Sequence, residues 1–496
     1  MKRHAKGRLP RGARRASLAS LLIVGAVICI ASARGDIVLY QVPATRLVFM
    51  LEGRTTVNPG KTVTLRHALG TVYLGLDDVK IFKVDPPNSL ASSKLNAATA
   101  SGDVKQCLAV AKWALHNGLL PKFYEARSAA WKVDSTNPTV RRLAALRQKM
   151  AAPLPPPARE KTELEAFAQG HSGMQFAYSK HFILMHDTTG AREGAPRGKS
   201  RAEERLDLLE TVYESFLMKF ALEGYELQVP REYLKVILFA RHEDYLRFCN
   251  LLGPELQSTA GFYQRDKNIS VFYVQGTHES FEALDTLSKA LQRERDEAVR
   301  NRTPGARELV RLVDTLQLLM MLSSINQDVE VVSHEATHHM AGVTGLMPGS
   351  APVPTWAAEG LATYFESPKE AAWSGIGAVN EDRLDWYKQL ERDPIHSSIE
   401  FVVTDRIFTQ ARATEGQLHG YGQAWALTHF LMERHFDKLM NWYILVGQRR
   451  QRERLTPEQL LSSFRFVFGD LRLLEQEWRL YMRGLQTDVE RVLKGN

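Results

Sequence analysis

The sequence has little cysteine, and apart from its first residues it has no excess of either charge. Only 3 of the 496 residues are cysteines, which excludes a small disulfide-rich scaffold. The formal net charge is +8, but seven of the 64 basic residues lie in the first 33 residues, which contain no acidic residue. The rest of the chain has 57 basic and 56 acidic residues. The charge therefore gives no support to nucleic-acid binding.

The sequence also lacks the signatures of a serine or cysteine hydrolase. It contains no G-x-S-x-G motif, and Cys107 and Cys249 lie in apolar helical patterns without an activating neighbour. For these two cysteines, one disulfide and two ordinary buried thiols both remain open. The third cysteine, Cys29, falls in the N-terminal leader and would be lost with it.

The leader, residues 1–33, is typical of a secretory signal peptide. A basic segment ends at Arg15, an apolar run follows at 18–33, and Ala31-Ser32-Ala33 has the A-x-A form of a cleavage site. The run is short for a membrane span, which needs about 20 residues. Membrane anchoring is therefore expected only if the leader is not cleaved. We expect an exported protein, either periplasmic or extracellular.

The remaining chain is expected to be α+β. Short strand-like runs between turns predict a small β unit at 36–85. Helical periodicity at 92–150 indicates a helix pair that resembles one tetratricopeptide unit. One such unit cannot form a solenoid, so we expect a spacer, or an adaptor that offers a surface to a protein partner. A proline-rich linker is predicted at 151–170. Strands followed by helices predict an α+β domain at 171–490.

The chemistry of this domain is indicated by "HEATH" at 334–338, which has the pattern H-E-x-x-H. Positions i and i+4 of a helix lie on one face, so His334 and His338 can bind one metal ion. Glu335 lies next to the first histidine, where its carboxylate reaches a water on the metal rather than the metal itself. His339 is rotated by about 100° around the helix axis, so packing is favoured over ligation for this residue.

A catalytic zinc ion needs three protein ligands and one open position. A third histidine soon after the motif is absent, because its place is taken by Thr344 and the next histidine is His396. The other known pattern is a glutamate on a second helix. The stretch "PVPTWAAEGLATYFE" at 352–366 predicts such a helix. Within it Glu359, 21 residues after His338, is favoured over Glu366, which lies two turns further on.

These motifs, H-E-x-x-H and then W-x-x-E-G-x-A at 356–362, resemble the gluzincin branch of zinc metallopeptidases. They are most similar to the peptidase MA-like domains of uncharacterised exported bacterial proteins, over about residues 175–480. The resemblance implies a zincin-like fold with zinc bound by His334, His338 and Glu359. In thermolysin-like members an acidic residue four positions after the ligand glutamate supports the first histidine, but here that position is Thr363. Glu366 is the candidate replacement.

A tyrosine completes the candidate site. In related aminopeptidases a tyrosine at the start of a later helix stabilises the oxyanion, and the resemblance gives this role to Tyr421 in "LHGYGQAWALTHFL". Its hydroxyl would donate to the developing negative charge, and packing in the core is the alternative. His419 is the second candidate donor, and His429 is expected to pack. The strand predicted at 269–274 is either an edge strand that pairs with a substrate backbone or an ordinary sheet strand.

The sequence therefore predicts a zinc-dependent peptidase in which Glu335 is the general base. Its expected partner is a peptide or protein substrate. Zinc is favoured over iron because no redox function is indicated, although the spacing does not exclude other metals. The alternative belongs to another class: a non-catalytic envelope protein that uses the domain as a scaffold and binds partners through its N-terminal units.

Overall fold

The computed structural model describes residues 35–43, 48–168, 171–190, 198–349, 351, 353–410, 414–448 and 455–494. These residues belong to one compact unit, Ser32–Asn496. The unit combines helices with several sheets, so the predicted α+β class is confirmed. The predicted signal peptide, residues 1–33, lies outside the described residues. Among the helices that are described, none has the length and apolar character needed to cross a membrane.

The N-terminal β unit is an antiparallel sheet of five strands in the order β4-β3-β2-β1-β5. Its inner face buries apolar side chains such as Val38, Leu51 and Leu65 against three leucines of helix α9 (Ala306–Val343). The sheet therefore completes its core with a helix that comes more than 200 residues later in the chain. The strands are β1 (Asp36–Gln41), β2 (Val48–Asn58), β3 (Thr62–His67), β4 (Gly70–Gly75) and β5 (Val79–Lys83).

Four helices follow, where the sequence indicated one pair. They are α1 (Pro87–Ala100), α2 (Val104–His116), α3 (Leu120–Val133) and α4 (Pro138–Ala151). Their apolar side chains, including Cys107 and Phe123, share one core cluster with helix α6 (Arg201–Leu222) and the C-terminal helices. The four helices are therefore part of the main body of the protein and differ from the expected separate spacer.

The segment expected to be a proline-rich linker, 151–170, contains helix α5 (Ala158–Phe167). The prolines end helix α4, but Pro157 is the N-cap of α5 and Leu164 of this helix is fully buried. A proline just before a helix is compatible with it because the first N–H groups need no intrahelical partner. The two cysteines of the described chain, Cys107 and Cys249, are both buried and unpaired.

A second sheet has the strand order β6-β7-β8-β10-β9. One face packs on α5 and α7 (His242–Leu252), and the other faces α6 and α9. Strand β10 lies between β8 and β9, so of the two alternatives for 269–274 the structure shows the ordinary sheet strand, and β9 is one of the two edge strands. The strands are β6 (Gln175–Tyr178), β7 (Phe182–His186), β8 (Leu234–Phe239), β9 (Gly261–Gln264) and β10 (Ile269–Tyr273).

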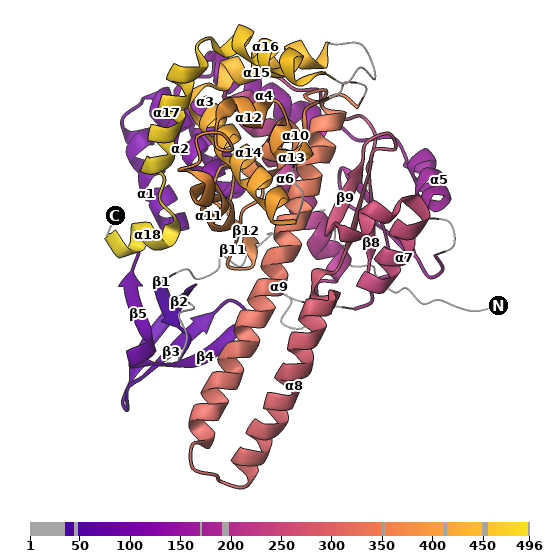
Figure 1. The fold of residues 1–496 in the computed structure, drawn as a ribbon. Helices are drawn as coiled ribbons and strands as arrows, with labels where there is room; N and C mark the ends of the chain where they lie inside the picture. The colour runs from indigo at the N-terminus through magenta and orange to yellow at the C-terminus, as the bar shows by residue number, and fades with distance from the viewer. Residues whose placement is uncertain are drawn as a thin grey trace, which may run out of the picture. The chain divides into compact units, whose positions relative to one another are not determined.

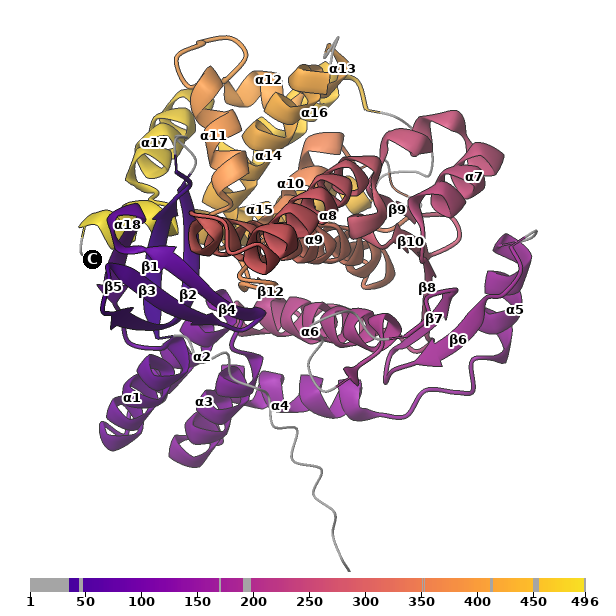
Figure 2. The ribbon, with the colours of Figure 1, turned by 90° about the horizontal axis from the view of Figure 1, so that it is seen from below.

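Helix α9 forms an antiparallel hairpin with α8 (Glu279–Arg300), and its second half passes between the second sheet and the C-terminal helices (Figures 1 and 2). In the residues described after α9, the helices are joined by one short β hairpin, and the core there holds four fully buried tryptophans: Trp356, Trp425, Trp442 and Trp478. The elements of this part are α10 (Thr355–Phe365), β11 (Pro368–Lys369), β12 (Ala372–Trp373), α11 (Glu381–Leu390), α12 (Ile399–Val403), α13 (Arg406–Thr409), α14 (Thr414–Arg434), α15 (Phe436–Gly447), α16 (Pro457–Phe468), α17 (Leu471–Gly484) and α18 (Asp488–Lys494).

Candidate metal centre

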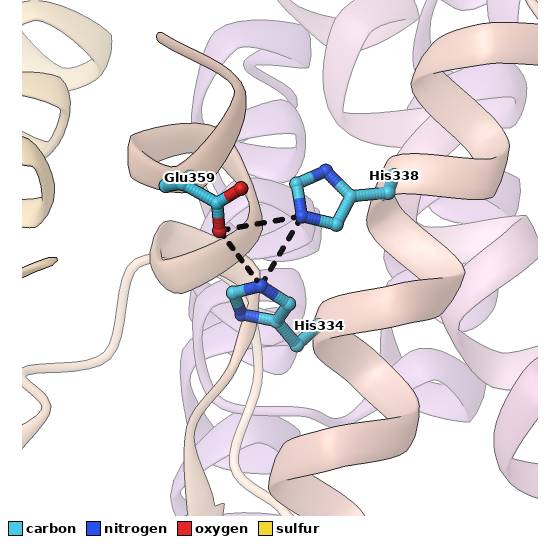
Figure 3. Close-up of side chains that lie close together, drawn as sticks. All are labelled: His334, His338 and Glu359. Atoms are coloured by element: carbon cyan, nitrogen blue, oxygen red, sulfur yellow. Dashed lines mark hydrogen bonds and ion pairs between the residues drawn. The ribbon is translucent and has the colours of Figure 1, made fainter. Parts of the chain in front are cut away.

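The H-E-x-x-H motif lies on helix α9, as predicted, and two of its side chains meet a glutamate from helix α10 (Figure 3). The Nε2 atoms of His334 and His338 are 3.2 Å apart. The Oε2 atom of Glu359 lies 3.2 Å from the first nitrogen and 3.5 Å from the second. In the part of the chain that the structure describes, this is the one group of three or more candidate metal ligands whose atoms lie within 4.8 Å of one another.

The three atoms fit a zinc ion. A tetrahedral zinc ion with bonds of about 2.0–2.1 Å places neighbouring ligand atoms about 3.4 Å apart, and the separations here are 3.2 to 3.5 Å. Two imidazoles and one carboxylate are also a donor set that zinc favours in catalytic sites. The three side chains are mostly buried but open onto a cleft, which leaves one side of the site accessible.

Glu359 is held in place by the packing of helix α10. The helix begins after Pro354, and the carboxylate of Asp405 accepts hydrogen bonds from the backbone N–H groups of Thr355 and Trp356, at 2.8 and 2.9 Å. A carboxylate at this end caps the helix and complements its dipole. Further along, a Cβ atom on Gly360 would lie 2.6 Å from the carbonyl oxygen of Ala424. Glycine therefore allows α10 to approach α14 closely.

Glu366 contacts the first histidine and is not part of the three-ligand cluster. The Nδ1–H group of His334 donates to the Oε2 atom of Glu366 at 2.6 Å. This bond fixes the tautomer and leaves the Nε2 lone pair free for a metal. Glu366 has 1% of its surface exposed and accepts a second hydrogen bond, from Nε of Arg383, at 2.6 Å. Glu366 therefore contacts His334, the histidine that the acidic residue replaced by Thr363 would support in thermolysin-like proteins.

Burial and the neighbouring charges shift the pKa values of Glu359 and Glu335 in opposite directions. Burial acts to raise the pKa of Glu359, but the neighbouring His338 and His334 lower it well below its usual range, so this group is ionised. Burial also acts to lower the pKa of His334, but hydrogen bonds to Glu359 and Glu366 raise it. For Glu335 the effect of burial prevails and its pKa is raised. Glu335 lines the same cleft as the two histidines, and its carboxyl binds protons more readily than an exposed glutamate.

Tyr421, on helix α14, also lies at the site. Its ring centroid is 6.3 Å from that of His334, and its side chain lines the cleft. The negative charge of Glu359, and then burial, raise the pKa of its hydroxyl. Tyr421 therefore stays protonated and can donate a hydrogen bond into the cleft.

The other histidines that the sequence singled out lie away from this cluster. Nδ1 of His419 donates to the carbonyl oxygen of Trp386 at 3.3 Å. His429 is buried and contacts the hydroxyl of Tyr481. His339 stacks on the ring of Tyr263, and its Nδ1 lies 3.0 Å from the hydroxyl of a buried serine. Burial lowers the pKa of His339 to about 3. His339 therefore packs on the side of α9 that faces the second sheet.

Sequence reasoning missed Arg383, which comes from helix α11. Its guanidinium donates to two carboxylates, from Nε to Glu366 and from Nη2 to Glu330, the latter at 3.2 Å. The same group lies 5.3 Å from the ring centre of Tyr421. Both carboxylates raise the pKa of Arg383, although burial opposes them. The residue belongs to no recognised motif, so nothing in the sequence points to it. It links the group that orients His334 to the candidate hydrogen-bond donor.

The metal centre opens onto a cleft of about 1170 Å³. Strand β9, the edge of the second sheet, forms one wall. A Cβ atom on Gly261 would lie 2.9 Å from Cγ1 of Val331, so glycine brings this strand against α9 one turn before His334. Helix α9 contributes a stripe of residues: Ser323, Asn326, Gln327, Glu330, Val331, His334, Glu335 and His338.

Comparison with known proteins adds one finding. No curated protein and no solved structure matches the chain. Residues 328–451, a quarter of the chain, match the model of a family described as a protein of unknown function (DUF1570). The matched segment contains the complete candidate centre, including Arg383 and Tyr421. The part of this chain that resembles that family is therefore the part that contains the candidate metal centre.

Proposed function

We propose that the protein is a zinc-dependent peptidase of the gluzincin type, with a zincin-like fold formed by the second sheet and the helices after it. The observation that carries the proposal is the convergence of ligand atoms from His334, His338 and Glu359 to within 3.5 Å of one another. The same cleft holds Glu335 and Tyr421, which are the residue types needed for a general base and a hydrogen-bond donor.

Each residue of the candidate site has a separate role in the proposed hydrolysis. A zinc ion held by His334, His338 and Glu359 would supply Lewis-acid activation of water and of a carbonyl. Glu335 takes the proton of the attacking water and passes it to the leaving amine. Tyr421 donates a hydrogen bond to the carbonyl oxygen as negative charge develops there. Glu366 and Arg383 hold His334 in its orientation.

The edge strand supports a peptide as the substrate. Strand β9 has β10 on one side and the cleft on the other, so its outer backbone groups can pair with an extended chain. A peptide bound in this way presents its carbonyl groups along helix α9. The signal-like leader supports the further proposal that hydrolysis takes place outside the cytoplasm, in a periplasm or in the extracellular space.

Metal analysis of the mature protein and two variants tests the proposal. We expect about one zinc ion per chain in the wild type. Glu359→Ala should lose most of the metal because it removes a ligand, whereas Glu335→Gln should keep it. Both should fail to hydrolyse casein-type protein substrates. Glu165→Ala, an exposed glutamate on α5 with a side chain 53% exposed, is the matched control and should behave as the wild type.

Two results would contradict the proposal at different points. Full zinc occupancy in Glu359→Ala would exclude Glu359 as a ligand. Zinc-loaded wild-type protein that cleaves no member of a peptide library would favour the non-catalytic scaffold instead.

A further inference from the structure

We propose that the N-terminal sheet forms a substrate-contacting wall of the cleft, in which Val48, Phe49 and Met50 of strand β2 are an apolar subsite. The inference rests on the proposed function and adds to it a preference: an apolar side chain several residues away from the cleaved bond. These three residues line the same cleft as His334 and Glu359. Val48 is 52% exposed, and the other two are half-buried.

The length of the cleft indicates how far this subsite is from the metal centre. Its stripe on α9 runs from Ser323 to His338, which is about 22 Å at 1.5 Å per residue. Phe49 packs against a cluster that contains Leu322 of the same helix, and Leu322 precedes His334 by about 18 Å of helix. An extended peptide rises about 3.3 Å per residue. A substrate therefore needs about five residues on one side of the cleaved bond to reach Phe49.

Ion pairs fix the sheet to the cleft. His67 of β3 lies 2.6 Å from Glu370, with exposed fractions of 1% and 7% for the two side chains. Glu52 of β2 pairs with Lys369 at 3.0 Å, and Lys369 also pairs with Asp488 of α18. Glu370 and Lys369 belong to the β11–β12 hairpin, which directly follows the Glu366 that orients His334.

Contacts with the sheet and with α9 hold the turn of this hairpin in an unfavourable backbone conformation. Glu370 and Ala371 both have positive φ angles, 52° and 61°, which non-glycine residues seldom adopt. The turn is held by the His67 pair and by a hydrogen bond from the Ala371 N–H group to Asn326 of α9, at 2.9 Å. Loss of the sheet would free this turn and expose the leucines of α9 that it covers. The sheet is therefore a permanent wall and differs from a removable pro-region.

Charge at this end of the cleft favours an apolar side chain on the substrate. Two charged residues of the cleft lining, Lys369 and Glu370, already pair with Glu52 and His67 of the sheet itself. The residues of β2 that remain available to a ligand are apolar, and a buried charge without a partner would be unfavourable there. Contact with Phe49 and its neighbours therefore selects a leucine-like residue over a charged or amide one.

Two series of peptides with one common cleaved bond test this inference. One series is lengthened on the N-terminal side and the other on the C-terminal side, with leucine or glutamine at each added position. For the wild type, kcat/KM should rise roughly tenfold when leucine reaches about the fifth position in one of the series. Phe49→Ala should lose this gain and cleave the shortest peptide as the wild type does. Val57→Ala, on the same strand and 59% exposed outside the cleft, should keep the gain.

A second variant and a second measurement make the result independent of folding and of turnover. Val48→Glu places a charge at an exposed position, so it should fold and should also lose the leucine preference. In Glu335→Gln, fluorescence anisotropy of labelled peptides should show the same preference in binding, roughly tenfold weaker after Phe49→Ala. Equal leucine preference in the wild type, Phe49→Ala and Val48→Glu would overturn the subsite. Zinc-loaded wild type that shows the preference in binding but no cleavage would overturn the proposed hydrolysis and leave the subsite standing.

Discussion

At the scale of single residues, two glutamates seven positions apart act on opposite nitrogens of one histidine. Glu359 faces Nε2 of His334, and Glu366 accepts a hydrogen bond from Nδ1. A zinc ligand needs a correctly oriented imidazole with its lone pair on the nitrogen that faces the metal, and a carboxylate on the far nitrogen fixes both the tautomer and the orientation. The proposed metal centre therefore depends on Glu366, which is not one of the three proposed ligands.

Glu366→Gln tests this dependence. The amide has nearly the same shape, but it removes the negative charge that faces His334 and Arg383. We expect zinc affinity to fall about 10- to 100-fold, as is usual when the partner of a metal-bound histidine is changed. Competition with a fluorescent chelator measures this affinity, and circular dichroism checks that the variant is folded. Unchanged affinity in a folded variant would mean that Glu366 does not orient the histidine.

At the scale of elements, spacing in the sequence predicted the two helices of the site well. The H-E-x-x-H helix and a helix that starts at Pro354-Thr355 are both found, because i, i+4 geometry and helix-start signals are local. The order of the second sheet could not be predicted in this way. Strand 269–274 has the composition of either an edge or an internal strand, and its place between β8 and β9 depends on distant pairing. Arg383 was missed for the same reason.

The close contact of α10 with α14 gives a prediction at this scale. In Gly360→Ala the new Cβ atom would overlap Ala424 and the side chain of Thr428, so the two helices must separate. We expect unfolding free energy to fall by about 1–3 kcal/mol and zinc to bind more weakly, because Glu359 precedes Gly360 directly. Urea unfolding and zinc titration measure the two effects. Gly484→Ala, where no atom lies near the new group, is the control and should cause neither loss.

At the scale of the whole molecule, a buried group of charges joins the N-terminal helices to the helices of the site. Lys219 of α6 has no exposed side-chain surface and lies 3.2 Å from Glu223 and 3.9 Å from Glu433 of α14. Its Nζ atom is 3.4 Å from Nε2 of His116 in α2. The hydroxyl group of Tyr364 in α10 donates a hydrogen bond to the carboxylate of Glu433. The composition of 151–170 predicted a linker that divides the chain into two parts. The buried charges connect helices on both sides of this segment, and no local sequence pattern can reveal such contacts.

This group of charges lowers the free energy of unfolding as the pH falls, and His116 and Glu433 both contribute to the loss. Burial and then Lys219 lower the pKa of His116 to about 4, so protonation favours the unfolded chain from about pH 6.5 downward. Burial acts to raise the pKa of Glu433, but Lys219 and His116 lower it to about 2. The stability that ionised Glu433 contributes is therefore present above about pH 4.3 and is lost as the pH falls toward 2.

Urea unfolding of the wild type and of His116→Gln between pH 7 and pH 4 tests how much of this loss of unfolding free energy is due to His116. The wild type should lose more unfolding free energy than the variant over this range, because the variant has no group at position 116 that takes up a proton on unfolding. Measurements in excess chelator remove the separate effect of metal binding. Parallel curves for the two proteins would show that His116 does not titrate with unfolding.

The ion pairs of Lys369 also have a consequence for the order in which the protein can assemble. This one side chain contacts Glu52 near the start of the folded chain and Asp488 near its end. The N-terminal sheet is made before α9, so its inner face has no cover until that helix has followed. Its ion pairs with Glu370 and Lys369 wait for the β11–β12 hairpin, and Asp488 of α18 then pairs with Lys369. A chain that is still being made thus lacks a finished cleft. The proposed peptidase would become competent to act only after α18 has been made and has paired with Lys369.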